Sequence, residues 1–238
     1  KERQGKHRES IPLFKQGLEI EEKALGKDHP DIAETLNNMA SAYQSLSNYE
    51  EAARLYERSL EIRLKKFGPD HMSIAETRNN LAFIYFNAGK YSEAEKIFVQ
   101  ILDDIKEALG PDHPNTATIE ENLAVIYMQQ EKFDEAAPLL EHSLKIKEKT
   151  LGPEHPELAV NMLNTAAIYR SKGEYAKAVE LSERACNIMK KSWGPDHPDY
   201  ATCISNLAFL YDNHGKFDQS LPLYEKALEI REKELGEE

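Results

Sequence analysis

Apolar residues recur along the chain at the spacing of amphipathic helices. Between residues 30 and 46 they form one stripe, made of Ile32, Ala33, Met39, Ala40, Ala42 and Tyr43. A polar break at Ser47 and Asn48 follows. A second stripe then runs from about Tyr49 to Lys66, with apolar positions at Ala52, Leu55, Tyr56, Leu60 and Ile62. The pattern predicts two helices, here called A and B, joined by a tight turn.

This two-helix pattern repeats with a period of 42 residues. Several columns keep the step without a slip: Gly26, Gly68, Gly110, Gly152, Gly194 and Gly236; His29, His71, His113, His155 and His197; Tyr43, Tyr85, Tyr127, Tyr169 and Tyr211. One helix pair cannot bury its apolar stripes alone, whereas stacked pairs share a continuous core. We therefore predict an all-α protein, an α-solenoid of antiparallel helix pairs.

Local signals predict where the helices begin and end. Gly26 suits the left-handed position after a last helical turn, Asp28 is the expected N-cap, and Pro30 fits a first turn. We expect about eleven helices in one domain over residues 1–238. Helix B of a truncated repeat covers 9–25, and five full repeats follow at 28–69, 70–111, 112–153, 154–195 and 196–236. Both ends look cut, which predicts a fragment of a longer protein or ends covered by self-association.

Composition and charge narrow the function classes. The formal net charge is −12, and excess acid repels phosphate backbones and anionic lipid, so nucleic acid and membranes are not expected partners. No apolar run approaches the length needed to span a bilayer, and the charged first ten residues are unlike a secretory signal. With only two cysteines, no disulfide framework is expected, which fits a reducing cytoplasm.

Units such as LNNMASAYQSLSNYEEAARLYERSLEIRLKKFGPDH resemble tetratricopeptide repeats. The 42-residue length, the linker L-G-P-D-H-P and the run N-L-A-x-x-Y are similar to the subclass found in kinesin light chains and nephrocystin-3-like proteins. The resemblance covers essentially the whole chain. It implies a right-handed superhelix with the A helices lining a concave face, where members of the family usually hold an extended or helical peptide.

One asparagine column is the main candidate for contact with such a peptide. Asparagine amides can pair with both the N–H and the C=O of a bound backbone, and the matching residue often does so in the family. The alternative is that these side chains bond the backbone of a neighbouring helix. The column comprises Asn38, Asn80, Asn122, Asn164 and Asn206.

Other A-helix positions are expected to set specificity. Exposed apolar groups on a polar face favour partner contact, although phenylalanines could instead pack on the next repeat. The bases found on the A helices are Arg78 and Arg170, fewer than in family members that grip carboxylates or acidic cargo, so the expected ligand is neutral or basic and partly apolar. The remaining candidates are Asn37, Asn79, Phe83, Phe86, Val125, Met128 and Phe209.

The histidines and cysteines are interpreted as structural. The histidines lie one repeat apart, about 10 Å for packed helix pairs, too far to share a metal ion bound at about 2 Å. Cys186 shares a column with leucines and is therefore expected in the core. Because Cys186 and Cys203 flank the turn at Gly194, a disulfide or redox role is the alternative. No phosphate-binding, nucleophile-elbow or metalloprotease motif is present, so we expect neither an enzyme nor a cofactor or metal.

These observations leave two function classes open. The first is an adaptor scaffold that holds a protein or peptide segment in the groove, like kinesin light chain. The alternative is a regulatory or self-assembling repeat segment of a larger multidomain protein, for example a nucleotide-switch protein. Self-association would then use the uncapped ends.

Overall fold

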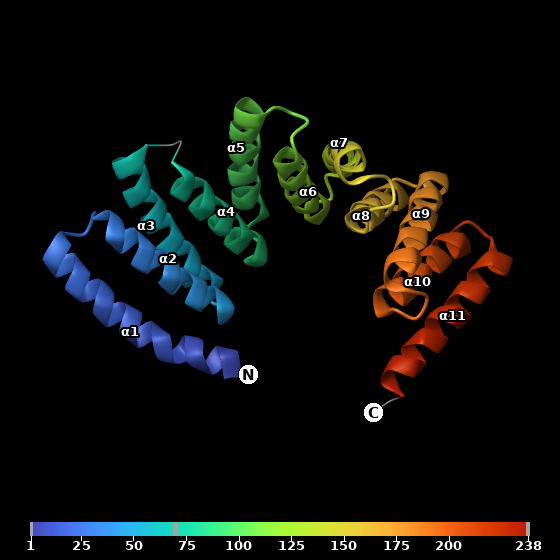
Figure 1. Cartoon of the computed structure of the whole chain (residues 1–238), viewed down its shortest axis with the longest axis horizontal. Helices are drawn as coiled ribbons and strands as arrows, with labels where there is room; N and C mark the ends of the chain where they lie inside the picture. Colours follow the sequence, from blue (N-terminus) through green and yellow to red (C-terminus); the bar gives the residue numbers. More distant parts are fainter. Residues whose placement is uncertain (1, 69–70, 237–238) are drawn as a thin grey trace. The chain divides into compact units, whose positions relative to one another are not determined.

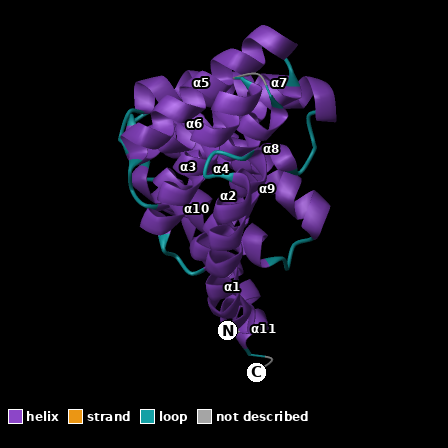
Figure 2. Ribbon diagram, turned by 90° about the vertical axis from the view of Figure 1, so that its left-hand side faces the viewer, coloured by secondary structure: helices purple, strands orange, loops and turns teal. Residues whose placement is uncertain are grey.

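The computed structural model describes residues 2–68 and 71–236, over which the chain is all-α (Figure 1). Short loops join the helices, and the described residues contain no strand (Figure 2). The predicted number of eleven is confirmed. The helices are α1 (Glu2–Leu25), α2 (Pro30–Ser45), α3 (Tyr49–Phe67), α4 (Met72–Asn87), α5 (Tyr91–Leu109), α6 (Pro114–Gln129), α7 (Phe133–Leu151), α8 (Glu157–Ser171), α9 (Tyr175–Trp193), α10 (Pro198–Asn213) and α11 (Phe217–Leu235).

The chain divides into two compact units, residues 1–104 and 105–238. In the first unit α2 packs against α1 and α3, and α3 packs against α4. In the second unit each helix from α6 to α11 packs against the next. The even-numbered helices are the predicted A helices and the odd-numbered ones are the B helices. The expected boundary between the first two repeats, at residues 69 and 70, lies outside the described residues.

The apolar stripes form the cores, as their spacing predicts. Every member of the first A stripe, from Ile32 to Tyr43, is buried, and Leu36 joins them. The repeats share small residues at the positions equivalent to Ala40 and Ala52, and these residues are buried as well. Small side chains at these points let helices A and B approach closely, so the larger side chains interdigitate around them.

The helix ends correct one prediction. Asp28 is not the N-cap of α2; His29 is, and its Nδ1 accepts a hydrogen bond from the backbone N–H of Asp31. The same bond, from the N–H two residues on to histidine Nδ1, is made by His71, His113, His155 and His197. An imidazole nitrogen therefore satisfies an otherwise unpaired donor at the start of every described A helix.

The turn between helices A and B also follows a repeated rule. Gly89, Gly173 and Gly215 have φ values of +73°, +76° and +72°, which fit the tight turn that the sequence predicts between the two helices. The other two repeats place Ser47 and Glu131 at the same point, with φ of +58° and +59°. A side chain at positive φ costs free energy that glycine avoids.

The two cysteines correct a second prediction. Cys186 of α9 and Cys203 of α10 are both buried, as expected of core residues, but their Sγ atoms form a disulfide. The Cα atoms lie 5.6 Å apart. The sequence interpretation that kept the thiols unpaired is wrong, because the antiparallel packing of α9 and α10 brings the two columns into register.

None of the described helices combines the length and apolar character needed to cross a bilayer.

Candidate functional site

The exposed side of the A helices carries the asparagine column. Asn38 and Asn206 are exposed, and Asn80, Asn122 and Asn164 are half-buried. Over residues 2–68 and 71–236, no side-chain hydrogen bond of these five asparagines is present, whereas other polar side chains on the same helices are bonded. Their amides are therefore free to pair with groups outside the chain. We call this side of α2 and α4, and of α6, α8 and α10, the A-helix face of each unit.

Arg78 does not lie on this face. It occupies the column of Leu36, Met162 and Ile204, which point into the core. Its side chain is only 18% exposed and pairs with Asp104 of α5, with a distance of 3.0 Å between the guanidinium Nη1 and the carboxylate Oδ2. A base in an inward column is thereby neutralised inside the first unit, and Arg78 leaves no free charge for a ligand.

The column that begins with Asn37 connects successive repeats. The Asn37 amide donates to Thr77 Oγ1 at 3.4 Å. Two repeats further on, Glu121 accepts bonds from Ser143, Lys147 and Asn161. Asn79, in the same column, is half-buried. These side chains therefore serve, at least in part, to connect neighbouring repeats.

The first unit's phenylalanines pack mainly on their own repeat. Phe83 meets the buried Phe98 edge to face, with ring centroids 5.5 Å apart, and Phe86 contacts Tyr91 at 5.6 Å. Phe98 and Tyr91 both belong to α5. In the second unit Val125 is half-buried and Met128 packs on the core cluster around Leu140. The predicted aromatic pair is thus largely part of the scaffold.

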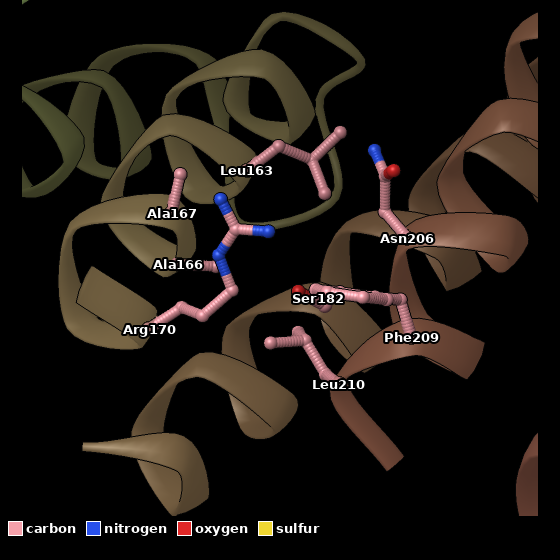
Figure 3. A pocket seen from close by; sticks show the side chains of 8 residues that line it. All are labelled: Leu163, Ala166, Ala167, Arg170, Ser182, Asn206, Phe209 and Leu210. Carbon is pink, nitrogen blue, oxygen red and sulfur yellow. The ribbon is translucent and has the colours of Figure 1, made fainter. Parts of the chain in front are cut away.

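A hollow opens on the A-helix face of the second unit, between α8 and α10 (Figure 3). Its volume is about 150 Å³. Arg170 of α8 reaches into it, Asn206 of α10 stands at its edge, and Phe209, which is 46% exposed, also lines it. The Arg170 guanidinium lies 5.5 Å from the centroid of the Phe209 ring. The other lining residues are Leu163, Ala166, Ala167, Ser182 and Leu210.

Sequence reasoning placed Arg170, Asn206 and Phe209 at a binding face but missed Ser182, which belongs to helix B. The sequence does contain a signal for Ser182, because the equivalent positions of the other repeats hold large residues. These are Tyr56, Phe98, Leu140 and Tyr224, and Ser182 is the one small side chain among them. A comparison restricted to the A helices could not find it.

Two tyrosines behind this face tie α8 and α10 to the helix B that precedes each of them. The Tyr169 hydroxyl donates to Glu141, and this hydrogen bond together with burial raises its pKa to about 12. Tyr211 donates to Glu183, and burial and that bond raise its pKa to about 12 as well. In the first unit, burial and the bond to Glu57 raise the pKa of Tyr85. These bonds fix the orientation of the A helices.

The electrostatics of the A-helix face differ between the units. In the first unit Glu34 and Glu76 are exposed, and neither takes part in an ion pair of the described chain. In the second unit Val160 is 55% exposed, Phe209 adds a ring, and Arg170 is the base that meets solvent. The face thus offers uncompensated negative charge in one unit and apolar surface in the other.

Repeated helix hairpins with an unbonded amide column define a repeat scaffold with a polar A-helix face, and comparison with known proteins identifies the repeat. Models of the tetratricopeptide repeat match residues 1–65, 73–149, 115–191 and 201–238. The chain belongs to the tetratricopeptide repeat family. Its helix spacing is that of the 42-residue subclass.

Several solved structures are similar to the chain. BtubC (BKLC) from P. vanneervenii has a TM-score of 0.77 at 22% identity, covering 97% of this chain and 92% of that one. The kinesin light chain-like repeats of Podosopora anserina have a TM-score of 0.76 at 28% identity, covering 87% and 98%. MamA reaches 0.61 at 18% identity, covering 83% and 97%. No curated protein sequence matches the chain.

Proposed function

We propose that this chain is a protein- or peptide-binding scaffold whose A-helix face holds a segment of a partner, in an adaptor role like that of kinesin light chain. The observation that carries the proposal is the asparagine column, whose amides have no partner among the described side chains and backbone. Unpaired amides in register along successive helices match the repeating donors and acceptors of a polypeptide backbone.

The chemistry of the face supports a neutral or basic, partly apolar partner. Glu34 and Glu76 in the first unit favour positive charge. Val160, Leu163 and Phe209 in the second unit favour apolar side chains, and exposed apolar groups of this kind mark contact sites. Arg78 contributes no free charge because Asp104 neutralises it. We propose binding with no catalytic step.

A second candidate function, self-assembly, has its own supporting observation. On α11 an apolar stripe is largely exposed: Phe217 by 65%, Leu221 by 60% and Leu228 by 58%. In the junction between α9 and α10 the same side of helix B packs on the next helix A, through Val179 and Cys186 of α9. Light scattering over a dilution series tests this candidate, which predicts a mass that rises with concentration and that falls in Leu228→Lys.

A cytoplasmic location remains part of the proposal, on altered grounds. The disulfide between Cys186 and Cys203 removes the argument from unpaired thiols. The acidic composition is what still supports it. Alkylation of the two cysteines in intact cells, before any lysis, measures whether they are paired at the location where the protein resides.

The binding proposal is tested with an array of immobilised 15-residue peptides of random sequence. Asn164→Ala and Asn206→Ala are expected to weaken binding of the selected peptides about three- to tenfold each, the loss of one or two hydrogen bonds. Asn187→Ala is the matched control, since Asn187 is an exposed asparagine on helix B. Equal binding by all three variants would move the site away from the A-helix face.

A further inference from the structure

Position 182 breaks the packing rule that the other repeats follow. Tyr56, Phe98 and Leu140 occupy its column in the first three repeats, and each is buried with a large side chain against helix A. Ser182 is equally buried, at 1% exposure, but has a far smaller side chain. The side chain at this position therefore fills less of the space between the two helices in the fourth repeat than in the first three.

The third repeat shows how a large side chain at this position normally packs. Leu140 packs in one core cluster with Ala124 of α6 and Ile168 of α8. The residues one repeat on are Ser182, Ala166 and Leu210, and all three line the hollow on the second unit. The hollow thus lies where the Leu140 side chain lies in the third repeat. Ala167 widens it, since its column holds Phe83 and Phe209 elsewhere.

The Ser182 hydroxyl lies at this hollow without a partner. Other buried serines of helix B are bonded: Ser59 to the Ala33 carbonyl, Ser143 to Glu121, and Ser220 to the Phe217 carbonyl. Ser182 makes no such bond within the described chain. The Ser182 oxygen is not sealed in the core but borders the open hollow, where a polar atom supplied from outside can pair with it.

The entrance to the hollow has a matching composition. Leu163 and Phe209 provide apolar walls, and Arg170 lies across the Phe209 ring with no carboxylate partner in the described residues. The Asn206 amide stands at the rim (Figure 3). A planar guanidinium can stack on a second ring as readily as on the first, so the entrance favours a flat side chain.

We propose that this hollow is a subsite for one aromatic side chain with a polar tip, a tyrosine of the bound polypeptide, whose hydroxyl pairs with Ser182. A cavity of about 150 Å³ holds one six-membered ring, and a phenol can both donate to and accept from a serine hydroxyl. Arg170 covers the ring and Asn206 bonds the adjacent backbone. This subsite rests on the proposed function, because the tyrosine belongs to a partner held on the A-helix face.

The ring is tested first with small probes, so that no partner is needed. p-Cresol and toluene carry the tyrosine and phenylalanine side chains, and their binding is followed by chemical shifts of methyl groups in Leu163 and Leu210. Wild-type protein is expected to bind both saturably. Ser182→Ala is expected to weaken p-cresol about fivefold, the loss of one hydrogen bond, and to leave toluene unchanged.

Ser182→Leu copies Leu140 of the third repeat and fills the hollow. It is expected to abolish binding of both probes and to raise the melting temperature, which also shows that the variant folds. Ser192→Leu adds the same side chain to an exposed position of α9 and is the matched control, with unchanged probe binding. Unchanged p-cresol binding in Ser182→Ala, an equal loss of both probes in that variant, or binding retained in Ser182→Leu overturns the subsite.

The peptide array separates this inference from the binding proposal. Peptides that depend on Asn164 and Asn206 are expected to lose about tenfold in affinity when a single tyrosine is replaced by alanine, and to lose the same amount against Ser182→Leu. If peptides depend on the asparagines but tolerate both changes, the A-helix face stands and the tyrosine subsite fails. If p-cresol binds but peptides do not, the hollow takes a free small aromatic molecule, and the assignment to a partner's side chain is overturned.

Discussion

Two junctions in the second unit use three shared columns in opposite ways. Between the third and fourth repeats, Glu121 accepts bonds from Ser143, Lys147 and Asn161. We call this group the polar junction. One repeat on, the positions of Glu121, Lys147 and Asn161 hold Leu163, Met189 and Cys203, and Cys203 is bonded to Cys186. We call these four residues the clipped junction.

The comparison shows which features the fold requires and which it leaves free. Both junctions keep the tyrosine bond to the preceding helix B, through Tyr169 and Tyr211, and both keep the buried alanine of helix A. What joins the repeats side by side is free to vary between an ionic network and an apolar, covalently linked contact. The clipped junction also contains the Ser182 hollow, so the variable columns are where this chain acquires its individual surface.

The largest expected difference concerns the disulfide. Reduction of Cys186–Cys203 opens a loop of sequence separation 17, and loops near this length contribute about 3 kcal/mol. The fourth and fifth repeats are expected to lose protection of α10 and α11 in hydrogen exchange, while α6 to α8 keep theirs. The double variant Cys186→Leu, Cys203→Thr copies Leu60 and Thr77 of the first unit. Its hydrogen exchange is expected to be the same with and without reductant. Identical exchange in oxidised and reduced protein would contradict the comparison.

The polar junction is expected to lose most of its stabilising effect when Glu121, the acceptor at its centre, is replaced. Glu121→Ala removes the acceptor of three bonds and leaves Lys147, whose side chain is 15% exposed, without its carboxylate. A cost of about 2 kcal/mol is expected from the unpaired buried groups, measured as the midpoint of urea unfolding. Glu135→Ala on the exposed side of α7 is the control. A change no larger than that of the control would show that the network is only a surface feature.

The shared tyrosine bonds predict alkaline sensitivity of both junctions. Because the pKa values of Tyr169 and Tyr211 are raised from 10.0 to about 12, their contribution is fully present below about pH 10 and is lost as pH rises toward 12. The double variant Tyr169→Phe, Tyr211→Phe is expected to lose less stability between pH 8 and pH 11 than wild type does. Tyr175→Phe serves as control, since its column already holds Phe133 and Phe217. Equal losses in all three proteins would rule out these bonds as the cause.

The smallest expected effect lies in the turns. The third repeat has Glu131 at φ +59°, where the fourth and fifth repeats have Gly173 and Gly215. Glu131→Gly is expected to stabilise the protein by about 0.5–1 kcal/mol, because it removes left-handed strain at some entropic cost. The melting temperature measures this, and Gly173→Ala is expected to shift it in the opposite direction. A destabilised Glu131→Gly would show that the side chain itself contributes to the turn.

The sequence predicted the repeated part of the structure and missed the exceptions within it. A fixed period determines which side of each helix is buried, so the stripes around Ile32 and the turn at Gly89 could be predicted. Arg78 was misplaced because its charge favoured the exposed face, while its column belongs to the core and Asp104 compensates it there. The histidine N-caps were not predicted, because aspartate is the commoner residue at that position.

The disulfide and the hollow depend on pairs of columns in different helices. Cys186 and Cys203 meet only because α9 and α10 pack in one particular register, and the effect of Ser182 is visible only beside Ala166 and Leu210. Periodicity within one helix carries no information on such contacts. These are also the places where the fourth repeat departs most from its neighbours.

The most direct test of the account follows the side-chain amide resonances of the asparagines while a peptide selected on the array is added. Asn122, Asn164 and Asn206 are expected to shift together and to gain protection from exchange with water, while Asn187 on helix B stays unchanged. Shifts confined to Asn187 and its surroundings, with the other three unaltered, would contradict the claim that the A-helix face binds polypeptide.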